Sequence, residues 1–326
     1  MRPRSTADGP FTHRSPRVLV IGASGYLGRH VRDRAAAAGL DVVTAGRTPL
    51  PDSRAHCLLD LAADQPAELA ATLAGQFPDV VVNCAGSTSP DVGTLAAANV
   101  TGTASLVSAL RRTGRSIRLV HLGSAAEYGP SEPGTAVAES APAHPAGAYG
   151  ATKLAATRLV ELGRATGLDA VVLRVFNPVG PGAPPSILPG RLVGELRRAA
   201  ADGSAVCLGP LDAVRDFVDA RDVADAAVAA ALAPCLPAAV INVGSGSGVP
   251  VRTLVRELVT ISGYDGPVEE RAAADGGGTE RAPAAGASWQ QADIARARRD
   301  LDWQPRRSLT ASLADLWEEC RVPANS

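Results

Sequence analysis

The chain has 326 residues, of which 46% are hydrophobic and 20% charged, and its formal net charge is −1. This length fits a cofactor-binding domain with a smaller second lobe. The balanced charge argues against a nucleic-acid partner or a membrane surface, and no apolar run is long enough to cross a bilayer.

Residues 1–16 are polar and contain no apolar core, so we expect a disordered extension and not a secretory signal. The cysteines are scattered, odd in number and without a CxxC pair: Cys57, Cys84, Cys207, Cys235 and Cys320. This usage is typical of reduced thiols in a cytoplasmic protein. No metal site is expected.

Strand-like and helix-like segments alternate along the first half of the chain. Strands are predicted at Arg17–Ile21, Asp41–Ala45, His56–Leu59, Val80–Asn83, Arg118–Leu122 and Ala170–Val175. Helices are predicted near Tyr26–Ala38, Pro66–Gln76, Leu95–Arg112 and Tyr149–Thr166. This alternation predicts an α/β fold of the Rossmann type, a doubly wound parallel sheet with helices on both faces.

The alternation loosens after Val175. Residues 177–189 are rich in Pro and Gly, and the Gly/Ala-rich stretch Ala272–Ser288 is typical of a mobile loop. We therefore expect a cofactor domain at 17–175 and a smaller C-terminal α/β lobe at 176–326 that binds substrate, with some of its segments returning to the sheet.

A glycine-rich turn joins the first predicted strand to the first predicted helix. Gly22 permits a tight turn, Gly25 lets the backbone approach a pyrophosphate, and Gly28 allows close helix–strand packing. The N–H groups at the start of the helix favour phosphate. The predicted dinucleotide site comprises Gly22, Ser24, Gly25, Tyr26, Leu27 and Gly28.

The end of the second predicted strand indicates which dinucleotide binds. An NAD enzyme usually has Asp or Glu there to accept a hydrogen bond from the ribose 2′-OH. Here Asp41 lies at the wrong end of the strand, and Arg47 lies at its tip. A guanidinium at this place can pair with a 2′-phosphate, which favours NADP(H).

The only lysine of the chain, Lys153, follows Tyr149 by four residues, which places both on one face of a helix. The other 31 basic residues are arginines, so a lysine is expected to persist where arginine would fail. A ketone reductase needs a proton donor whose pKa is close to the working pH. A lysine ammonium and a positive nicotinamide ring can lower the pKa of tyrosine towards this range.

Ser124 completes the predicted catalytic set. It follows the predicted strand Arg118–Leu122, at the carboxyl end where ligands bind in open α/β sheets. Its hydroxyl could donate to a substrate carbonyl and hold it within reach of Tyr149.

These motifs resemble those of the extended short-chain dehydrogenase/reductases, the family of nucleotide-sugar epimerases, dehydratases and reductases. The resemblance rests on the glycine turn, Tyr149 and Lys153, and on the segments at 60–61, 99–103, 124–129, 173–177, 215–218, 242–246 and 293–303. It implies that Asp60, Leu61, Ala85 and Asn99 help to bind the cofactor. It also implies a substrate site formed by Ser124, Ala125, Ala126, Asn177, Arg215 and Arg281.

The resemblance further implies a homodimer formed by the helices near 95–112 and 149–166. The sequence departs from the family near the C-terminus, where Arg281 is followed by Ala282, Pro283 and Ala284 in place of an Arg-Pro-x-acid segment. This departure weakens the assignment of Arg281 to the substrate diphosphate.

Several positions indicate which reaction of the family to expect. Ala125 and Ala126 stand where dehydratases carry an acidic pair, and Arg47 argues against an epimerase that retains NAD. Residues 209–217 resemble the corresponding segment of GDP-4-keto-6-deoxy-D-mannose reductases, while the arginine bias suggests a GC-rich bacterium with deoxysugar pathways. The expected activity is NADPH-dependent reduction of a 4-keto-6-deoxyhexose linked to TDP, in preference to GDP, in antibiotic biosynthesis.

Three alternatives remain: an NAD-dependent nucleotide-sugar 4-epimerase, a catalytically silent NADP sensor, and a reductase of aromatic polyketides. Retention of Tyr149 and Lys153 argues against the sensor. Arg215 and Asn177 argue against an apolar polyketide, which has no diphosphate.

Overall fold

The computed structural model describes residues 15–271, apart from 52 and 54, and residues 288–321. Its main feature is a seven-stranded parallel sheet in the order β10-β6-β5-β4-β1-β2-β3. The strands are β1 (Arg17–Ile21), β2 (Asp41–Gly46), β3 (His56–Leu58), β4 (Val80–Asn83), β5 (Arg118–Ser124), β6 (Ala170–Val175) and β10 (Val240–Val243). The strand order reverses between β1 and β4, which opens a crevice at the carboxyl ends of the strands.

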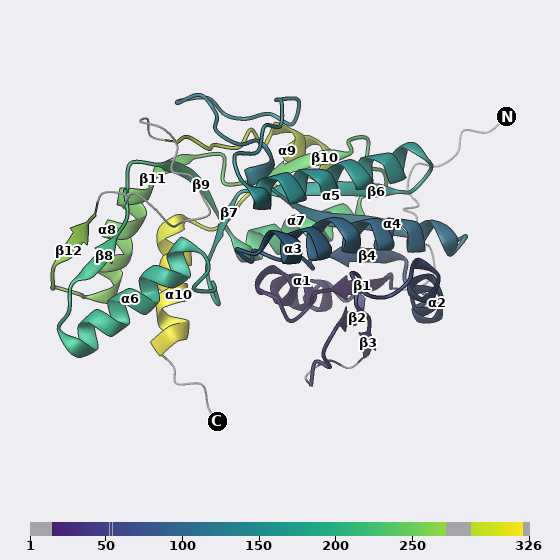
Figure 1. Cartoon of the computed structure of the whole chain (residues 1–326), viewed down its shortest axis with the longest axis horizontal. Coiled ribbons are helices and arrows are strands. Elements are labelled where there is room, and N and C mark those ends of the chain that lie inside the picture. Colours follow the sequence, from purple (N-terminus) through teal and green to yellow (C-terminus); the bar gives the residue numbers. More distant parts are fainter. Residues whose placement is uncertain (1–14, 52, 54, 272–287, 322–326) are drawn as a thin grey trace.

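Helices cover both faces of this sheet (Figure 1). They are α1 (Tyr26–Ala37), α2 (Pro66–Gln76), α3 (Val92–Leu95), α4 (Gly102–Arg112), α5 (Ala148–Ala165), α7 (Ala220–Leu232) and α9 (Ala295–Leu301). Alternate residues of β1 enter two separate cores. Val18 and Val20 pack on the side of α1 and α7, and Leu19 and Ile21 pack on the side of α2, α4 and α5. Burial on both faces explains why the central strands β1 and β4 are largely apolar.

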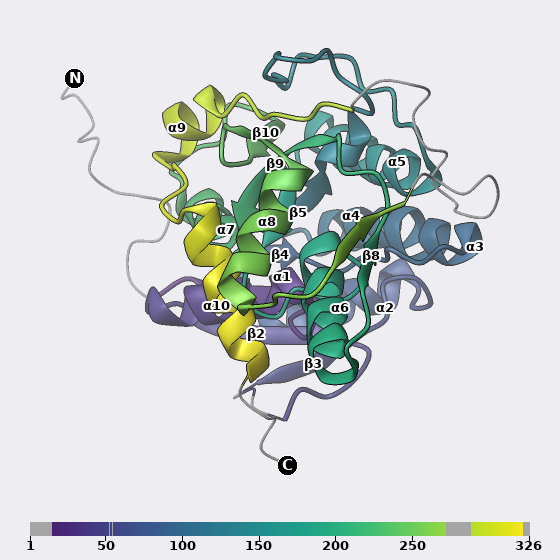
Figure 2. The same cartoon turned by 90° about the vertical axis from the view of Figure 1, so that its left-hand side faces the viewer.

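The smaller lobe has its own core, formed by α6, α8 and α10 around short strands. Figure 2 shows these three helices in front of the parallel sheet. The elements of the lobe are α6 (Leu188–Asp202), α8 (Val251–Ser262), α10 (Leu309–Arg321), β7 (Asn177–Val179), β8 (Val206–Leu208), β9 (Val214–Asp219), β11 (Gly248–Pro250) and β12 (Val268–Glu270). They include a three-stranded sheet, β11-β9-β7, and the pair β12-β8.

The expected α/β doubly wound fold is confirmed. The six expected strands begin at the expected residues, and three of them end one or two residues away from the prediction. The helix expected over 95–112 differs, because a π-helix at Ala96–Thr101 separates α3 from α4. The stretch Ala272–Ser288 lies outside the described residues except for Ser288, as do most of residues 1–16. Among the described helices, none is both long and apolar enough to span a membrane.

Candidate active site

The turn between β1 and α1 has the close backbone packing that its glycines predict. Gly22 has a φ of +77°, and a Cβ there would lie 2.8 Å from the main-chain nitrogen of Ala85. A Cβ on Gly28 would lie 2.0 Å from the Gly22 oxygen. Ser24 and Gly25 are exposed, and Gly25, as the N-cap residue, has no side chain to occupy the N–H groups of the first turn. The helix start can therefore present these donors to a phosphate.

Three predicted cofactor residues lie at the carboxyl ends of β2 and β3, beside the glycine turn. Arg47 directly follows β2 and is exposed. Asp60 accepts a hydrogen bond of 2.9 Å from the N–H of Ala62, which fixes the turn after β3. Leu61 is buried against α4, where a Cβ on Gly102 would lie 3.1 Å from the Leu61 Cβ. Because β1, β2 and β3 are parallel neighbours, these residues share one edge of the sheet.

Asn99 lies in the π-helix, and its buried amide joins two segments near this edge. Its oxygen accepts a hydrogen bond of 2.8 Å from the N–H of Ser87, and its nitrogen donates to the Thr152 hydroxyl at 3.0 Å. The π-helix thus brings the loop after β4 against α5, next to Lys153. The side chain of Asn99 supports the site from behind, and its predicted contact with a cofactor stays a prediction.

The structure brings Ser124 and Tyr149 together. Ser124 is the last residue of β5, and its hydroxyl oxygen accepts a hydrogen bond of 3.2 Å from the N–H of Ala126. The Ser124 side chain lies within hydrogen-bonding reach of Tyr149, which lies in the first turn of α5. A Cβ on Gly150 would lie 2.4 Å from the Ala126 oxygen, so glycine lets α5 start close to Ser124.

Lys153 lies one helical turn after Tyr149 and is buried, with 6% of its surface exposed. Its Nζ donates a hydrogen bond of 2.5 Å to the main-chain oxygen of Leu122 on β5. Burial lowers the pKa of Lys153, while the charge of Glu127 and the Cys84 thiol raise it.

The surroundings of Tyr149 shift its pKa. Burial raises it above its usual value, the hydrogen bond from Ser124 lowers it, and the negative charge of Glu127 raises it. The lowering expected from Lys153 together with a nicotinamide ring stays a prediction; in the structure the Lys153 ammonium donates to the Leu122 carbonyl.

A buried polar network behind Ser124 was not foreseen. Glu127, in the 3-10 helix Ala125–Glu127, pairs with Arg174 at 2.7 Å. The Arg174 guanidinium lies 4.5 Å from the centre of the Tyr128 ring, and the Tyr128 hydroxyl donates to Asn242 at 2.7 Å. An arginine inside the apolar strand Ala170–Val175 was the one sequence signal for a buried partner.

The predicted substrate residues occupy several elements. Ala125 is buried and Ala126 half-buried beside Ser124. Asn177 on β7 donates to the main-chain oxygen of Asp216 at 3.0 Å, and Arg215 on β9 donates to the oxygen and hydroxyl of Ser288 at 2.9 and 2.7 Å. Asn177 thus links β7 to β9, and Arg215 links β9 to the segment at Ser288. Arg281 lies outside the described residues.

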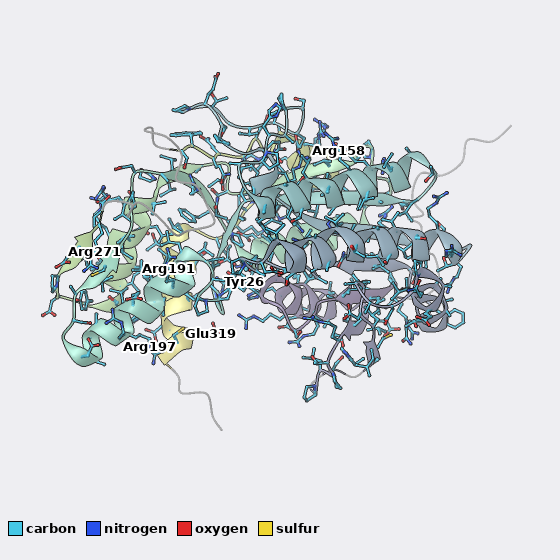
Figure 3. The ribbon with its side chains drawn as sticks, in the orientation of Figure 1. Tyr26, Arg158, Arg191, Arg197, Arg271 and Glu319 are labelled. Atoms are coloured by element: carbon cyan, nitrogen blue, oxygen red, sulfur yellow. The ribbon has the colours of Figure 1, made fainter. Side chains whose placement is uncertain are left out.

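The first turn of α1 also contacts the smaller lobe. The Tyr26 hydroxyl lies 3.4 Å from the Gly180 oxygen, and Arg29 and His30 both reach the Pro181 oxygen at 3.0 Å. Figure 3 shows Tyr26 at the junction of the two lobes. Leu27, in the same turn, packs against the core on the α1 side. The predicted dinucleotide turn is thereby coupled to the lobe expected to bind substrate.

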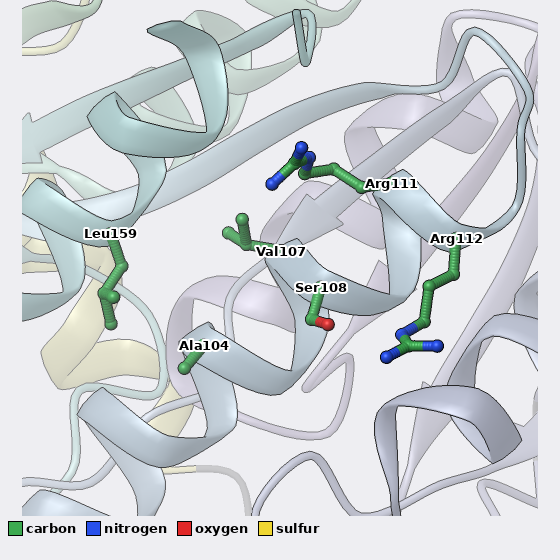
Figure 4. Close-up of a pocket in the computed structure, with 6 residues that line it drawn as sticks. All are labelled: Ala104, Val107, Ser108, Arg111, Arg112 and Leu159. Atoms are coloured by element: carbon green, nitrogen blue, oxygen red, sulfur yellow. The ribbon is translucent and has the colours of Figure 1, made fainter. Parts of the chain in front are cut away.

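A surface hollow between α4 and α5 contains none of the predicted site residues (Figure 4). It is lined by Ala104, Val107, Ser108, Arg111, Arg112 and Leu159. Within the described ranges, no group of three or more His, Cys, Asp or Glu residues is placed to hold a metal ion.

Known proteins are similar to this chain in sequence and in fold. The family model described as the NAD dependent epimerase/dehydratase family matches residues 18–244. The chain is 40% identical to dTDP-6-deoxy-L-talose 4-dehydrogenase (NAD(P)(+)) of Kitasatospora kifunensis, over 94% of this chain and 96% of that protein. It is 30% identical to GDP-6-deoxy-D-mannose reductase of Pseudomonas aeruginosa, over 76% of this chain and 80% of that protein.

A solved structure agrees with these matches. The structure of RMD from Pseudomonas aeruginosa complexed with NADPH superposes with a TM-score of 0.78 and 27% sequence identity. The match covers 95% of this chain and 99% of that one.

Proposed function

Because the chain belongs to the NAD dependent epimerase/dehydratase family, we propose that it interconverts the 4-keto and 4-hydroxyl forms of a dTDP-linked 6-deoxyhexose, in the direction of reduction by NADPH. The observation that supports this most strongly is the contact between Ser124 and Tyr149, with Lys153 buried one turn later. This set can bind a carbonyl oxygen and protonate it.

The chain's own residues account for the proton transfer. The Ala126 N–H donates to the Ser124 hydroxyl oxygen, which leaves the hydroxyl hydrogen able to be donated to a keto oxygen. Burial raises the pKa of Tyr149, so the phenol is protonated before the reaction. It can then give this proton to the same oxygen. A bound reduced nicotinamide supplies the hydride to the keto carbon. Lys153 holds a positive charge near the oxygen that becomes an alkoxide.

The residues around the glycine turn fit a dinucleotide. The open N–H groups at the start of α1 suit the pyrophosphate, and Asp60 and Leu61 lie where the adenosine would bind. The exposed guanidinium of Arg47 suits a 2′-phosphate. NADPH is therefore the proposed reductant, as in the solved structure of RMD.

The substrate class follows from the relatives. The dehydrogenase of Kitasatospora kifunensis, by its name, acts at position 4 of a dTDP-linked 6-deoxysugar, and hydride transfer at that carbon is reversible. A deoxysugar pathway of antibiotic biosynthesis, in the cytoplasm where NADPH is available, is the proposed setting.

Dehydration of the sugar is disfavoured by the surroundings of Ser124. Ala125 and Ala126 carry no acid, and the carboxylate of the next residue, Glu127, already accepts hydrogen bonds from Ser124, Thr157 and Arg174. It is therefore not free to remove a proton from a sugar.

A homodimer through α4 and α5 is also proposed. The outer face of α5 exposes 65% of Leu162. The hollow between the two helices could receive the same face of a second copy.

The direct test is a panel of dTDP- and GDP-linked 4-keto-6-deoxyhexoses with NADPH or NADH. We expect NADPH oxidation with a dTDP-linked sugar and a product bearing a 4-hydroxyl group by NMR. Tight co-purified NAD with interconversion of 4-epimers and no net oxidation would instead identify an epimerase. Absence of cofactor oxidation with every keto sugar would reject the proposed reduction.

A further inference from the structure

Glu127 is completely buried and is held by three hydrogen bonds. Its Oε1 accepts from the N–H of Ser124 at 2.8 Å, and its Oε2 accepts from the Thr157 hydroxyl at 2.8 Å and from Arg174 Nε at 2.7 Å. A Cβ on Gly123 would lie 2.7 Å from the same Oε1. Glycine at 123 therefore makes room for the carboxylate beneath the strand that ends at Ser124.

The three donors come from the elements that form the candidate active site. Ser124 ends β5, Arg174 lies on β6, and Thr157 lies on α5 four residues after Lys153, on the same face of the helix. The carboxylate thus joins the strand that carries Ser124 to the helix that carries Tyr149 and Lys153. Replacing the Glu127 carboxylate by an uncharged group would therefore alter the positions of both β5 and α5.

We propose that Glu127 is a positioning residue for the proposed reduction: it fixes the backbone at Ser124 and, through Thr157, places a negative charge beside the face of α5 that carries Lys153. This inference rests on the proposed function for its effect on turnover. Its effect on Lys153 is a property of the protein alone.

The charged and titratable groups around the pair support this role. Facing Lys153 are Glu127 and the Cys84 thiol, which raise its pKa against the effect of burial, and Lys153 in turn lowers the pKa of His121 on β5. Facing Glu127 are Arg174 from β6 and the Tyr149 phenol, whose pKa Glu127 raises. The carboxylate therefore favours the charged form of Lys153 and the protonated form of Tyr149. These are the forms needed to donate a proton.

The single lysine makes this inference directly measurable. Protein labelled with 13Cε-lysine and carrying a lysine-free tag gives one lysine signal, that of Lys153. In E127Q the pKa of this signal should fall relative to the wild type, and kcat should fall roughly 10- to 100-fold through misplacement of Ser124. The KM for NADPH should change little, since Glu127 lies behind the site.

Two matched variants separate this role from the loss of any buried carboxylate. T157V removes one hydrogen bond but keeps the charge, so the titration of Lys153 should stay at its wild-type midpoint. D222N removes a buried carboxylate on α7 that pairs with Arg307. It should leave both the lysine titration and kcat unchanged.

Should E127Q fail to fold, E127M/R174M removes both charges without leaving one unpaired, and a smaller fall in the Lys153 pKa is expected because the Arg174 cation is lost together with the carboxylate. An unchanged lysine titration in the folded variant would overturn the charge role, and an unchanged kcat would overturn the positioning role. If the wild-type protein reduces no keto sugar, the proposed function fails, but the titration still decides the charge role.

Discussion

The Nζ of Lys153 donates a hydrogen bond of 2.5 Å to the main-chain oxygen of Leu122, two residues before Ser124. This bond links helix α5 to the strand that ends in the candidate active site. The bond holds a buried cation one helical turn from Tyr149, whose pKa is raised by burial and by Glu127 and lowered by Ser124. Lys153 is thus a buried cation that the fold holds against the sheet.

Replacement of Lys153 by arginine should therefore impair the enzyme although the charge is kept. The site leaves 6% of the side chain exposed, so a larger planar guanidinium would displace its neighbours. We expect kcat for keto-sugar reduction to fall about 100-fold or more. Arg158→Lys, at an exposed position of the same helix (Figure 3), should leave kcat unchanged. Full activity of K153R would show that any cation serves.

Arg47 should decide the preference between NADPH and NADH. In R47L we expect the KM for NADPH to rise roughly 10- to 100-fold, as for loss of a charged hydrogen bond, with little change for NADH. Steady-state kinetics with both cofactors measure the ratio. Arg256→Leu, at an exposed site on α8, is the control and should alter neither value. Equal losses with both cofactors would contradict a 2′-phosphate contact.

His121 should make the protein less stable in acid. Burial and the Lys153 charge hold the pKa of His121 well below 6.5. Below pH 6.5 the unfolded chain gains a proton at this residue that the folded chain does not, so the free energy of unfolding should fall by up to about 1.4 kcal/mol per pH unit. Urea unfolding between pH 7 and 5.5 should show a smaller fall in H121N. The exposed His144 provides the control, H144N. Equal pH dependence in H121N and the wild type would contradict a neutral buried His121.

The proposed dimer predicts that Leu162→Glu yields monomers. A carboxylate at this exposed position of α5 would be buried unpaired against the second copy. Light scattering after size-exclusion chromatography should give one chain mass for L162E and two for the wild type. Leu58→Glu, at another exposed leucine on β3, should stay dimeric. A monomeric wild type would reject the proposed interface.

The sequence predicted most of the sheet and part of the site. The central strands β1 and β4 are largely apolar runs because both faces are buried, and this pattern is local. β10 at the sheet edge was not located in advance, because Val240–Val243 lies far along the chain and joins β6 only through the fold. The tight turn at Gly22 and the close packing at Gly28 were predictable, because a strand that passes directly into a helix needs both.

The missed features depend on tertiary contacts. The π-helix around Asn99 accompanies the bonds of its amide to Ser87 and Thr152, which lies over fifty residues away. The ion pair of Glu127 with Arg174 likewise joins a 3-10 helix to the strand β6 and follows no fixed sequence spacing. The pKa of Tyr149 could not be predicted because its burial and the direction of the Lys153 side chain are set by packing.

The central claim is that Tyr149 donates the proton in a reduction driven by NADPH. The most direct measurement is single-turnover reduction of a dTDP-linked 4-keto-6-deoxyhexose by wild-type, Y149F and Y264F protein. Tyr264 lies in the smaller lobe, where its hydroxyl bonds to the Ser204 oxygen, and serves as the matched control. We predict a rate in Y149F lower by about 100- to 10,000-fold and a wild-type rate in Y264F. Equal rates in Y149F and the wild type would contradict the account.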